Sequence, residues 1–363
     1  LQITNYYLLW ADELVDEIGP VVDPELALRN SFSFLAPLIP KLEKVAVSGG
    51  NLAIIRTLHA ACLAEYRTAG DLNNVDVEAL EVVKPDCGGY NGIREEEAKT
   101  FETEIDRRIF PTTEARETFI RRYVEPQLAQ GTKGQTNSSW LGYKEEFQPL
   151  RAKLSIDWLV RYRALPFHTL DTLFNIAAGF ADRERLKEII LERCAEFMFF
   201  WPDQTKDDEL EQRRKFWFFR ALYFIPELPG VYFDWLTADT DTVLAIYERS
   251  GRGNRIDNEA RPSLTARKVE AILDAFIGVW PKVPLPGSHG SESPKGEKAY
   301  RCLSELVWSI SSDSPDAAIP VLKRLISDSR YADMLNDLKS IRTEHTRKKA
   351  LADFAPPSPQ EIV

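Results

Sequence analysis

Apolar side chains recur at helical spacing through most of this chain of 363 residues, and no segment shows five or more alternating positions of a half-buried strand. From about residue 151 the pattern becomes regular, with apolar stripes separated by short breaks. The helices expected there cover residues 154–162, 167–178, 183–197, 209–225, 240–250, 265–279, 298–310, 314–327 and 331–354. Two helices per unit give a period of roughly 35 to 45 residues, which is typical of HEAT and armadillo repeats. We therefore predict an all-α fold with a HEAT/armadillo-like helical-repeat solenoid.

The N-terminal part predicts helices with less regular spacing. One apolar helix face is expected near the start of the chain: Tyr6, Trp10, Leu14 and Ile18. Asp23 and Pro24 suit the N-cap and the first position of a second helix. That helix is expected to bend or break around Pro37 and Pro40 and to end near Val47. Further helices are expected over 51–67, 94–109 and 111–130.

Two stretches rich in turn residues interrupt this N-terminal pattern. Between residues 70 and 93 the helical period fails, and residues 80–83 have the composition of a short strand. Residues 131–139 (GTKGQTNSS) are small and polar, as in mobile linkers. We expect an N-terminal helical subdomain over 1–138, with an irregular insert near 70–93, followed by HEAT-like repeats over 139–363.

Composition narrows the class of protein. Hydrophobic residues make up 44% of the chain and charged residues 28%, as in ordinary soluble proteins. The formal net charge is -10, whereas nucleic-acid-binding domains are usually basic, so nucleic acid is not the expected partner. The four cysteines form no CxxC pair and no apolar run reaches 18 residues. We expect reduced thiols, a cytoplasmic location and no membrane span.

The chain lacks the common catalytic and phosphate-binding motifs. The chain contains no GxxxxGK[ST], no GxSxG and no HExxH. His59 and Cys62 are three residues apart on one predicted helix, and this spacing favours a packed core pair over a pair of metal ligands. We therefore expect no catalytic residue, no bound metal and no cofactor in this chain.

One pattern offers an enzymatic alternative. Asp86, in a Pro-Asp pair, is followed by Glu97 and Lys99, which matches the PD…ExK order of a common nuclease core. In that core two carboxylates hold Mg²⁺ and the lysine supports the attacking water. The core needs adjacent strands, whereas residues 94–109 predict a helix. A solvated helix face is therefore the favoured interpretation, and a Mg-dependent nuclease or hydrolase is the alternative.

The segment 197–235 has the most unusual composition in the chain, because aromatic residues stand beside basic ones. Its cations include Arg213, Arg214, Lys215 and Arg220. Aromatic and basic side chains together can stack nucleic-acid bases, but aromatic residues on all sides of a helix are typical of a buried central helix. Core packing is the favoured prediction, with a protein-partner surface and a nucleic-acid-binding repeat module as alternatives.

Two further basic clusters complete the candidate partner surface. A glycine-rich loop contains Arg252 and Arg255, and the last predicted helix contains Arg342, Arg347 and Lys348. The full candidate set is Arg213, Arg214, Lys215, Arg220, Arg252, Arg255, Arg342, Arg347 and Lys348. The expected partner is a protein or a flanking domain of the same polypeptide.

The C-terminal stretch, residues 313–363, resembles the helical region that follows the nucleotide-binding core in large bacterial NACHT/STAND-type NTPases. The matching positions are Leu322, Leu325, Leu335, Leu338, Arg342, Arg347, Phe354, Pro357 and Pro359. The resemblance implies a scaffold or sensor segment of a defence-type protein, similar to antiphage sensors, with any nucleotide site or effector activity outside this chain. Residues 358–362 also have the pattern of a helix start, so we expect the chain to be a piece of a longer protein.

Overall fold

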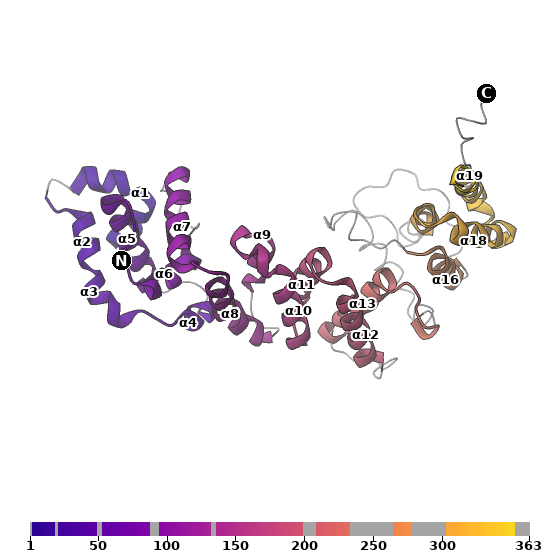
Figure 1. Cartoon of the computed structure of the whole chain (residues 1–363), viewed down its shortest axis with the longest axis horizontal. Coiled ribbons are helices and arrows are strands. Elements are labelled where there is room, and N and C mark those ends of the chain that lie inside the picture. The colour runs from indigo at the N-terminus through magenta and orange to yellow at the C-terminus, as the bar shows by residue number, and fades with distance from the viewer. Residues whose placement is uncertain are drawn as a thin grey trace, which may run out of the picture. The chain divides into compact units, whose positions relative to one another are not determined.

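The computed structural model describes residues 2–18, 21–48, 53–87, 94–131, 136–198, 208–232, 264–277 and 303–352, and every regular element in these ranges is a helix (Figure 1). The prediction of an all-α fold is therefore confirmed for these ranges. The chain divides into two compact units, Leu1–Ala181 and Asp182–Val363. The boundary expected at residue 138 lies inside the first unit. No helix in the described ranges is long and apolar enough to cross a membrane.

The first unit contains eleven α-helices and four short 3-10 helices among its described residues. The α-helices are α1 (Gln2–Ile18), α2 (Pro24–Asn30), α3 (Phe32–Leu35), α4 (Leu42–Val47), α5 (Ala53–Ala69), α6 (Val77–Val83), α7 (Glu95–Ile109), α8 (Thr113–Ala129), α9 (Trp140–Tyr143), α10 (Arg151–Arg161) and α11 (Phe167–Phe180). The 3-10 helices are η1 (Ala36–Leu38), η2 (Lys84–Asp86), η4 (Asn137–Ser139) and η5 (Glu145–Leu150).

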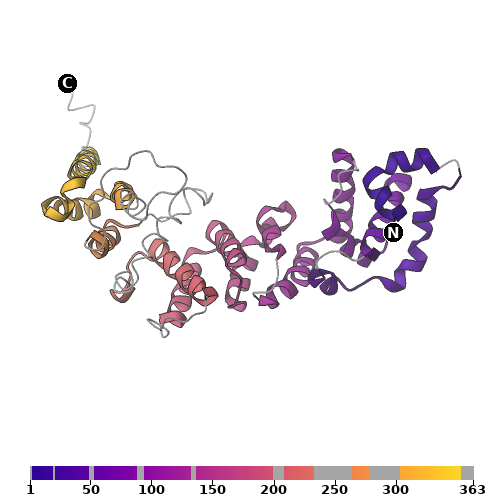
Figure 2. The same cartoon turned by 180° about the vertical axis from the view of Figure 1, so that it is seen from behind.

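The second unit begins with α12 (Arg183–Met198) and α13 (Asp208–Phe224), which pack against each other. Its later elements are α16 (Ala266–Ile277), η7 (Ile310–Ser312), α18 (Pro315–Ser327), η8 (Ser329–Met334) and α19 (Leu335–Ala352). Residues 303–309 are also helical. Helix α18 packs against α19 and α16, and Figure 2 shows α18 and α19 side by side from the opposite direction. The helix expected over 240–250 lies outside the described residues.

Helix starts follow the expected capping chemistry. The Asp23 carboxylate accepts the Leu26 N–H at 2.9 Å, and Pro24 occupies the first turn of α2. The Ser314 hydroxyl accepts the Ala317 N–H at 3.3 Å at the start of α18. Each cap satisfies an N–H that has no partner within its helix. The break expected before Val47 is also present, because α3, η1 and α4 replace one continuous helix.

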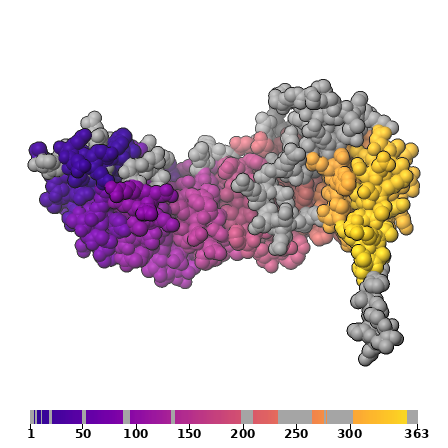
Figure 3. Space-filling model, turned by 90° about the horizontal axis from the view of Figure 1, so that it is seen from above, coloured from indigo at the N-terminus to yellow at the C-terminus, as the bar shows by residue number. Residues whose placement is uncertain are grey.

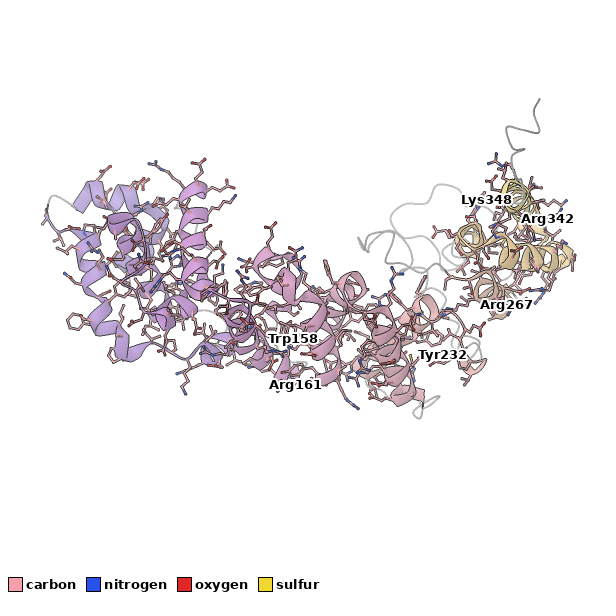
Figure 4. The ribbon with its side chains drawn as sticks, in the orientation of Figure 1. Trp158, Arg161, Tyr232, Arg267, Arg342 and Lys348 are labelled. Carbon is pink, nitrogen blue, oxygen red and sulfur yellow. The ribbon has the colours of Figure 1, made fainter. Side chains whose placement is uncertain are left out.

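The core of the first unit forms around α5, which contacts α1, α2, α3 and α6. Its residues from Leu58 to Ala64 are fully buried, because α5 has neighbours on several sides. Helix α10 buries Trp158, whose indole N–H donates to Glu125 Oε1 at 3.1 Å. Arg161, labelled beside Trp158 in Figure 4, pairs with the other oxygen of Glu125 at 2.8 Å and joins α10 to α8.

Two expectations about local structure are wrong. Residues 80–83 belong to α6 rather than to a strand, and Leu80, Val82 and Val83 are all buried in the helical core. Helix α1 is kinked at Trp10, which has non-helical dihedral angles (φ -148°, ψ 57°) and is 48% exposed. Because the kink changes the register of the helix faces, Tyr7 and Leu8 enter the core in place of Trp10.

The two stretches rich in turn residues are only partly irregular. Within 70–93, α6 and η2 are regular, turns occupy 71–75, and residues 88–93 lie outside the described ranges. Of the expected linker, residues 132–135 lie outside the described ranges. Residues 137–139 form η4, in which Ser138 is buried.

Candidate partner surface

The aromatic segment of α13 lies in the core of the second unit. Phe216, Trp217, Phe218 and Phe219 are each at most 5% exposed. Phe218 stacks on Tyr232, with ring centroids 5.7 Å apart. These rings have no free face on which a nucleic-acid base could stack. They are core residues, as the favoured interpretation expected.

The cations of α13 are buried or paired. Arg220 is 7% exposed, and its guanidinium lies 4.6 Å from the centroid of the Phe216 ring. Lys215 pairs with Glu211 at 2.7 Å, and Arg213 lies 3.9 Å from Glu209. Arg214 is half-buried and also has an interaction partner. This helix therefore does not present its four cations together to a partner, and Arg252 and Arg255 lie outside the described residues.

The basic residues of α19, unlike those of α13, lie on or near an exposed helix end. Leu338, Ile341 and His345 form the buried face of this helix, and His345 Nε2 lies 3.1 Å from the Ile310 carbonyl oxygen. Beyond His345, every residue from 346 to 352 is exposed. A helix end that buries nothing gains little from packing. Figure 3 shows this end of the helix, in yellow, at the surface of the second unit.

Arg342, Arg347 and Lys348 stand on or beside this exposed end. Arg347 is 68% exposed, and its only ion pair in the described structure is with Glu344, at 3.2 Å. This contact lowers the pKa of Glu344. Arg342 is half-buried and Lys348 is exposed, and neither has an ion-pair partner among the described residues. Both are labelled on α19 in Figure 4.

Two neighbours extend this basic end, which we call the α19 surface and define as Arg342, Arg347, Lys348, Lys349 and Leu351. Lys349 Nζ donates to Asp316 Oδ1 at 2.5 Å and ties α19 to the first turn of α18. Leu351 is 63% exposed. Arg347 and Lys348 stand about one turn before Leu351. Cations beside an exposed apolar side chain suit an acidic, partly apolar protein segment. The arrangement contains no nucleophile paired with a base, so it suits binding rather than catalysis.

Comparison with known proteins gives no relative for this chain. No protein-family model, no curated protein and no solved structure matches it. The function must therefore be argued from the geometry.

The residues of the nuclease-like pattern are engaged in other contacts. Asp86 Oδ2 lies 3.0 Å from His59 Nδ1, and this imidazole stacks on Phe101. Glu97 accepts two hydrogen bonds from the Arg67 guanidinium, at 2.6 and 2.8 Å. Lys99 is exposed on α7. In the described part of the chain, no three His, Cys, Asp or Glu side chains are arranged to hold a metal ion.

His59 and Cys62 occupy the core of the first unit. His59 is 2% exposed and Cys62 is fully buried. Burial raises the pKa of the Cys62 thiol well above its ordinary value, so the reactive thiolate is disfavoured. The predicted core pair is confirmed.

Sequence reasoning missed two buried lysines. Lys84 has a fully buried side chain that faces Glu102, Asp106 and Glu146. Lys268 is 3% exposed and lines a cavity of the second unit. One signal was available for Lys268, because it stands beside Val269 and one turn before Ile272, on the apolar stripe of its helix.

Proposed function

We propose that this chain is a non-catalytic helical module that binds a protein partner, or a flanking domain of its own polypeptide, through the α19 surface. The observation that carries the proposal is the exposed C-terminal end of α19, where Lys348 has no ion-pair partner among the described residues, as is also true of the half-buried Arg342 before it. Cations without an acidic neighbour can pair with the carboxylates of an acidic segment.

The proposal includes a partner of stated chemistry. The α19 surface offers Arg342, Arg347 and Lys348 for carboxylates, and it offers Leu351 for an apolar side chain. An acidic helix or loop with one apolar side chain matches both features. Electrostatic attraction would make association faster at low ionic strength.

We also propose a HEAT-like architecture and a defence- or signalling-type NTPase as the larger context. In favour of the architecture, α10 packs on α11, α12 on α13 and α18 on α19, so helices adjacent in sequence form pairs. Stacked pairs of this kind present extended binding surfaces in solenoids. The resemblance of residues 313–363 to NACHT/STAND-type proteins supports the proposal that the chain belongs to a larger NTPase. A phosphate-binding loop in the sequence that precedes residue 1 would support it, and a complete reading frame without one would contradict it.

The test is affinity purification of the tagged full-length protein from its own cells, with quantitative mass spectrometry. The variant carries Arg342→Glu and Lys348→Glu, two substitutions on α19 that leave the buried residues Leu338, Ile341 and His345 in place. Reversing two contacting charges should weaken a specific partner by at least about tenfold, equivalent to about 1.4 kcal/mol.

The matched control carries Lys323→Glu and Lys99→Glu. Both lysines are exposed, on α18 and α7, so the control makes the same change in net charge away from the α19 surface. Partner recovery should match the wild type. Equal loss in both variants, or no loss in either, would contradict the proposed surface.

A further inference from the structure

A cavity of the second unit lies between the end of α13, the start of α16 and the first half of α18. Its volume is about 680 Å³, within the range of small-molecule sites. Residues 226–228 form one side, and Thr265 with Arg267 and Lys268 of the first turn of α16 forms another. Asp313 and α18 complete the lining. Figure 4 labels Arg267 on α16.

Lys268 is the unusual feature of this cavity. Its side chain lines the cavity although the residue is only 3% exposed. Its ammonium group donates to the Leu222 carbonyl at 2.6 Å and also to the Ile225 carbonyl, both at the end of α13. An ammonium group has three N–H donors, and no carboxylate pairs with this one in the described structure. Burial without a counter-charge lowers the pKa of Lys268 to about 8.

The two aspartates that line the cavity have hydrogen-bond partners of their own. The Asp313 carboxylate accepts the N–H groups of Ala266 and Ser314, both at 2.7 Å. Asp316 accepts from Lys349. Asp316 is therefore paired with a cation, whereas Asp313 is held only by neutral backbone groups.

The remaining charges around the cavity are of both signs. Arg324 is held by both oxygens of Glu270, at 2.6 Å each. Arg267 is exposed and has no ion-pair partner among the described residues, like the buried Lys268. Of the lining acids, Glu227 and Asp313 have no ion-pair partner in the described structure, and Asp313 is held by backbone N–H groups. Two cations without an ion-pair partner thus line the cavity, and Lys268 is the buried one of the two.

We propose that this cavity is a binding site for a small organic anion, whose carboxylate or sulfonate-type group is held by Lys268 and Arg267. Leu228, Pro320 and Val321 supply apolar surface for the rest of such a ligand. A bound anion provides the counter-charge that the buried ammonium lacks. The site is separate from the α19 surface and does not depend on the proposed partner.

Binding of an anion in the cavity should be accompanied by uptake of a proton by Lys268. An anion stabilises the charged form of Lys268 and therefore raises its pKa. Near pH 8 about half of the Lys268 side chains are neutral before binding, so binding takes up as much as about half a proton. Near pH 6 the group is already charged, and binding should take up none.

The test is isothermal titration calorimetry of the whole chain with benzoate, benzenesulfonate and neutral benzyl alcohol. Each titration is run near pH 6 and near pH 8 in two buffers of different ionisation enthalpy, which together give the number of protons taken up. We expect at least one anion to bind at least about tenfold more tightly than benzyl alcohol. The two anions distinguish a carboxylate site from a sulfonate-type site.

Two variants test whether Arg267 and Lys268 form the anion site. Arg267→Gln changes an exposed side chain and should weaken anion binding without affecting the fold, whereas Lys268→Met should abolish both the preference for anions and the proton uptake. Lys323→Gln, an exposed lysine of α18 outside the cavity lining, is the matched control and should bind like the wild type. The proposal is overturned if neither anion is preferred, if Arg267→Gln binds anions normally, or if no proton is taken up near pH 8.

Discussion

Lys84 Nζ lies 2.9 Å from Glu102 Oε1 and joins η2 to α7 inside the first unit. The same ammonium group pairs with Asp106 and lies 3.4 Å from Glu146 of η5. Burial alone would lower the pKa of Lys84, but the carboxylates of Asp106 and Glu102 outweigh it and raise that pKa. One buried lysine thus holds three carboxylates from two elements.

Replacing Lys84 by Met should destabilise the first unit. The substitution leaves the partly buried carboxylates of Glu102, Asp106 and Glu146 beside one another without their shared cation. Removing one partner of a buried ion pair costs about 3 kcal/mol or more. Urea unfolding followed by circular dichroism measures the change.

The control for this prediction is Lys153→Met. Lys153 pairs with Glu117 at 2.8 Å, but its side chain is 57% exposed. Exposed pairs contribute about 1 kcal/mol or less. Equal effects of the two substitutions would contradict the structural role given to Lys84.

Asp106 should give the first unit a specific pH dependence. Burial outweighs the neighbouring Lys84 ammonium and raises the pKa of Asp106 from 3.8 to about 6. Between these values the folded state binds more protons than the unfolded state, so the free energy of unfolding falls as the pH rises. Glu102 acts in the opposite direction: burial raises its pKa, but hydrogen bonds from Lys144 and Lys84 outweigh this and lower it.

Comparison with Asp106→Asn isolates this contribution from that of Glu102. Between pH 4 and pH 7 the wild type should lose about 1 to 3 kcal/mol relative to the variant. Urea unfolding at both pH values measures the difference. Parallel pH profiles for the two proteins would show that the Asp106 pKa is not raised.

The aromatic residues of α13 should behave as core residues. Phe219 is 1% exposed, so Phe219→Ala should destabilise the second unit by about 3 to 5 kcal/mol. Phe34 is 77% exposed, and Phe34→Ala should change the free energy of unfolding by less than about 0.5 kcal/mol. Thermal unfolding of both variants checks the contrast. A small effect of Phe219→Ala would reopen the surface interpretation of this segment.

The N-cap of α18 should make a measurable local contribution. Ser314→Ala removes the acceptor of the Ala317 N–H and should cost about 1 kcal/mol. Ser327→Ala, at the other end of the same helix, removes only an exposed hydroxyl that donates to the Lys323 carbonyl, and it should be nearly neutral. Chemical denaturation compares the two variants. The capping interpretation fails if Ser327→Ala costs as much as Ser314→Ala.

The sequence predicted those parts of the fold that depend on local chemistry. The start of α2 follows from Asp23 and Pro24, and that of α18 follows from Ser314, because a cap acts within its own first turn. The kink at Trp10 and the helical state of Leu80 were missed. Leu80 is fully buried among neighbouring helices, and such packing outweighs local preference.

The candidate site was predictable only in part. The basic character of α19 is visible in the sequence, but the pairing of Lys349 with Asp316 and the absence of such a pair for Arg342 depend on how α18 and α19 pack. The cavity around Lys268 joins residues of α13, α16 and α18, which are distant in the sequence, so no local pattern could reveal it.

Photo-crosslinking from Leu351 tests the central proposal most directly. A photoreactive amino acid replaces Leu351, which is 63% exposed on the α19 surface, in the full-length protein inside its own cells. The same amino acid at Trp308, which is 47% exposed in the same unit, is the control. We predict one dominant crosslink from position 351, to an acidic protein segment or to a flanking domain, and its loss when Arg342→Glu and Lys348→Glu are added. Only background crosslinks from position 351, equal to those from position 308, would contradict the proposed partner surface.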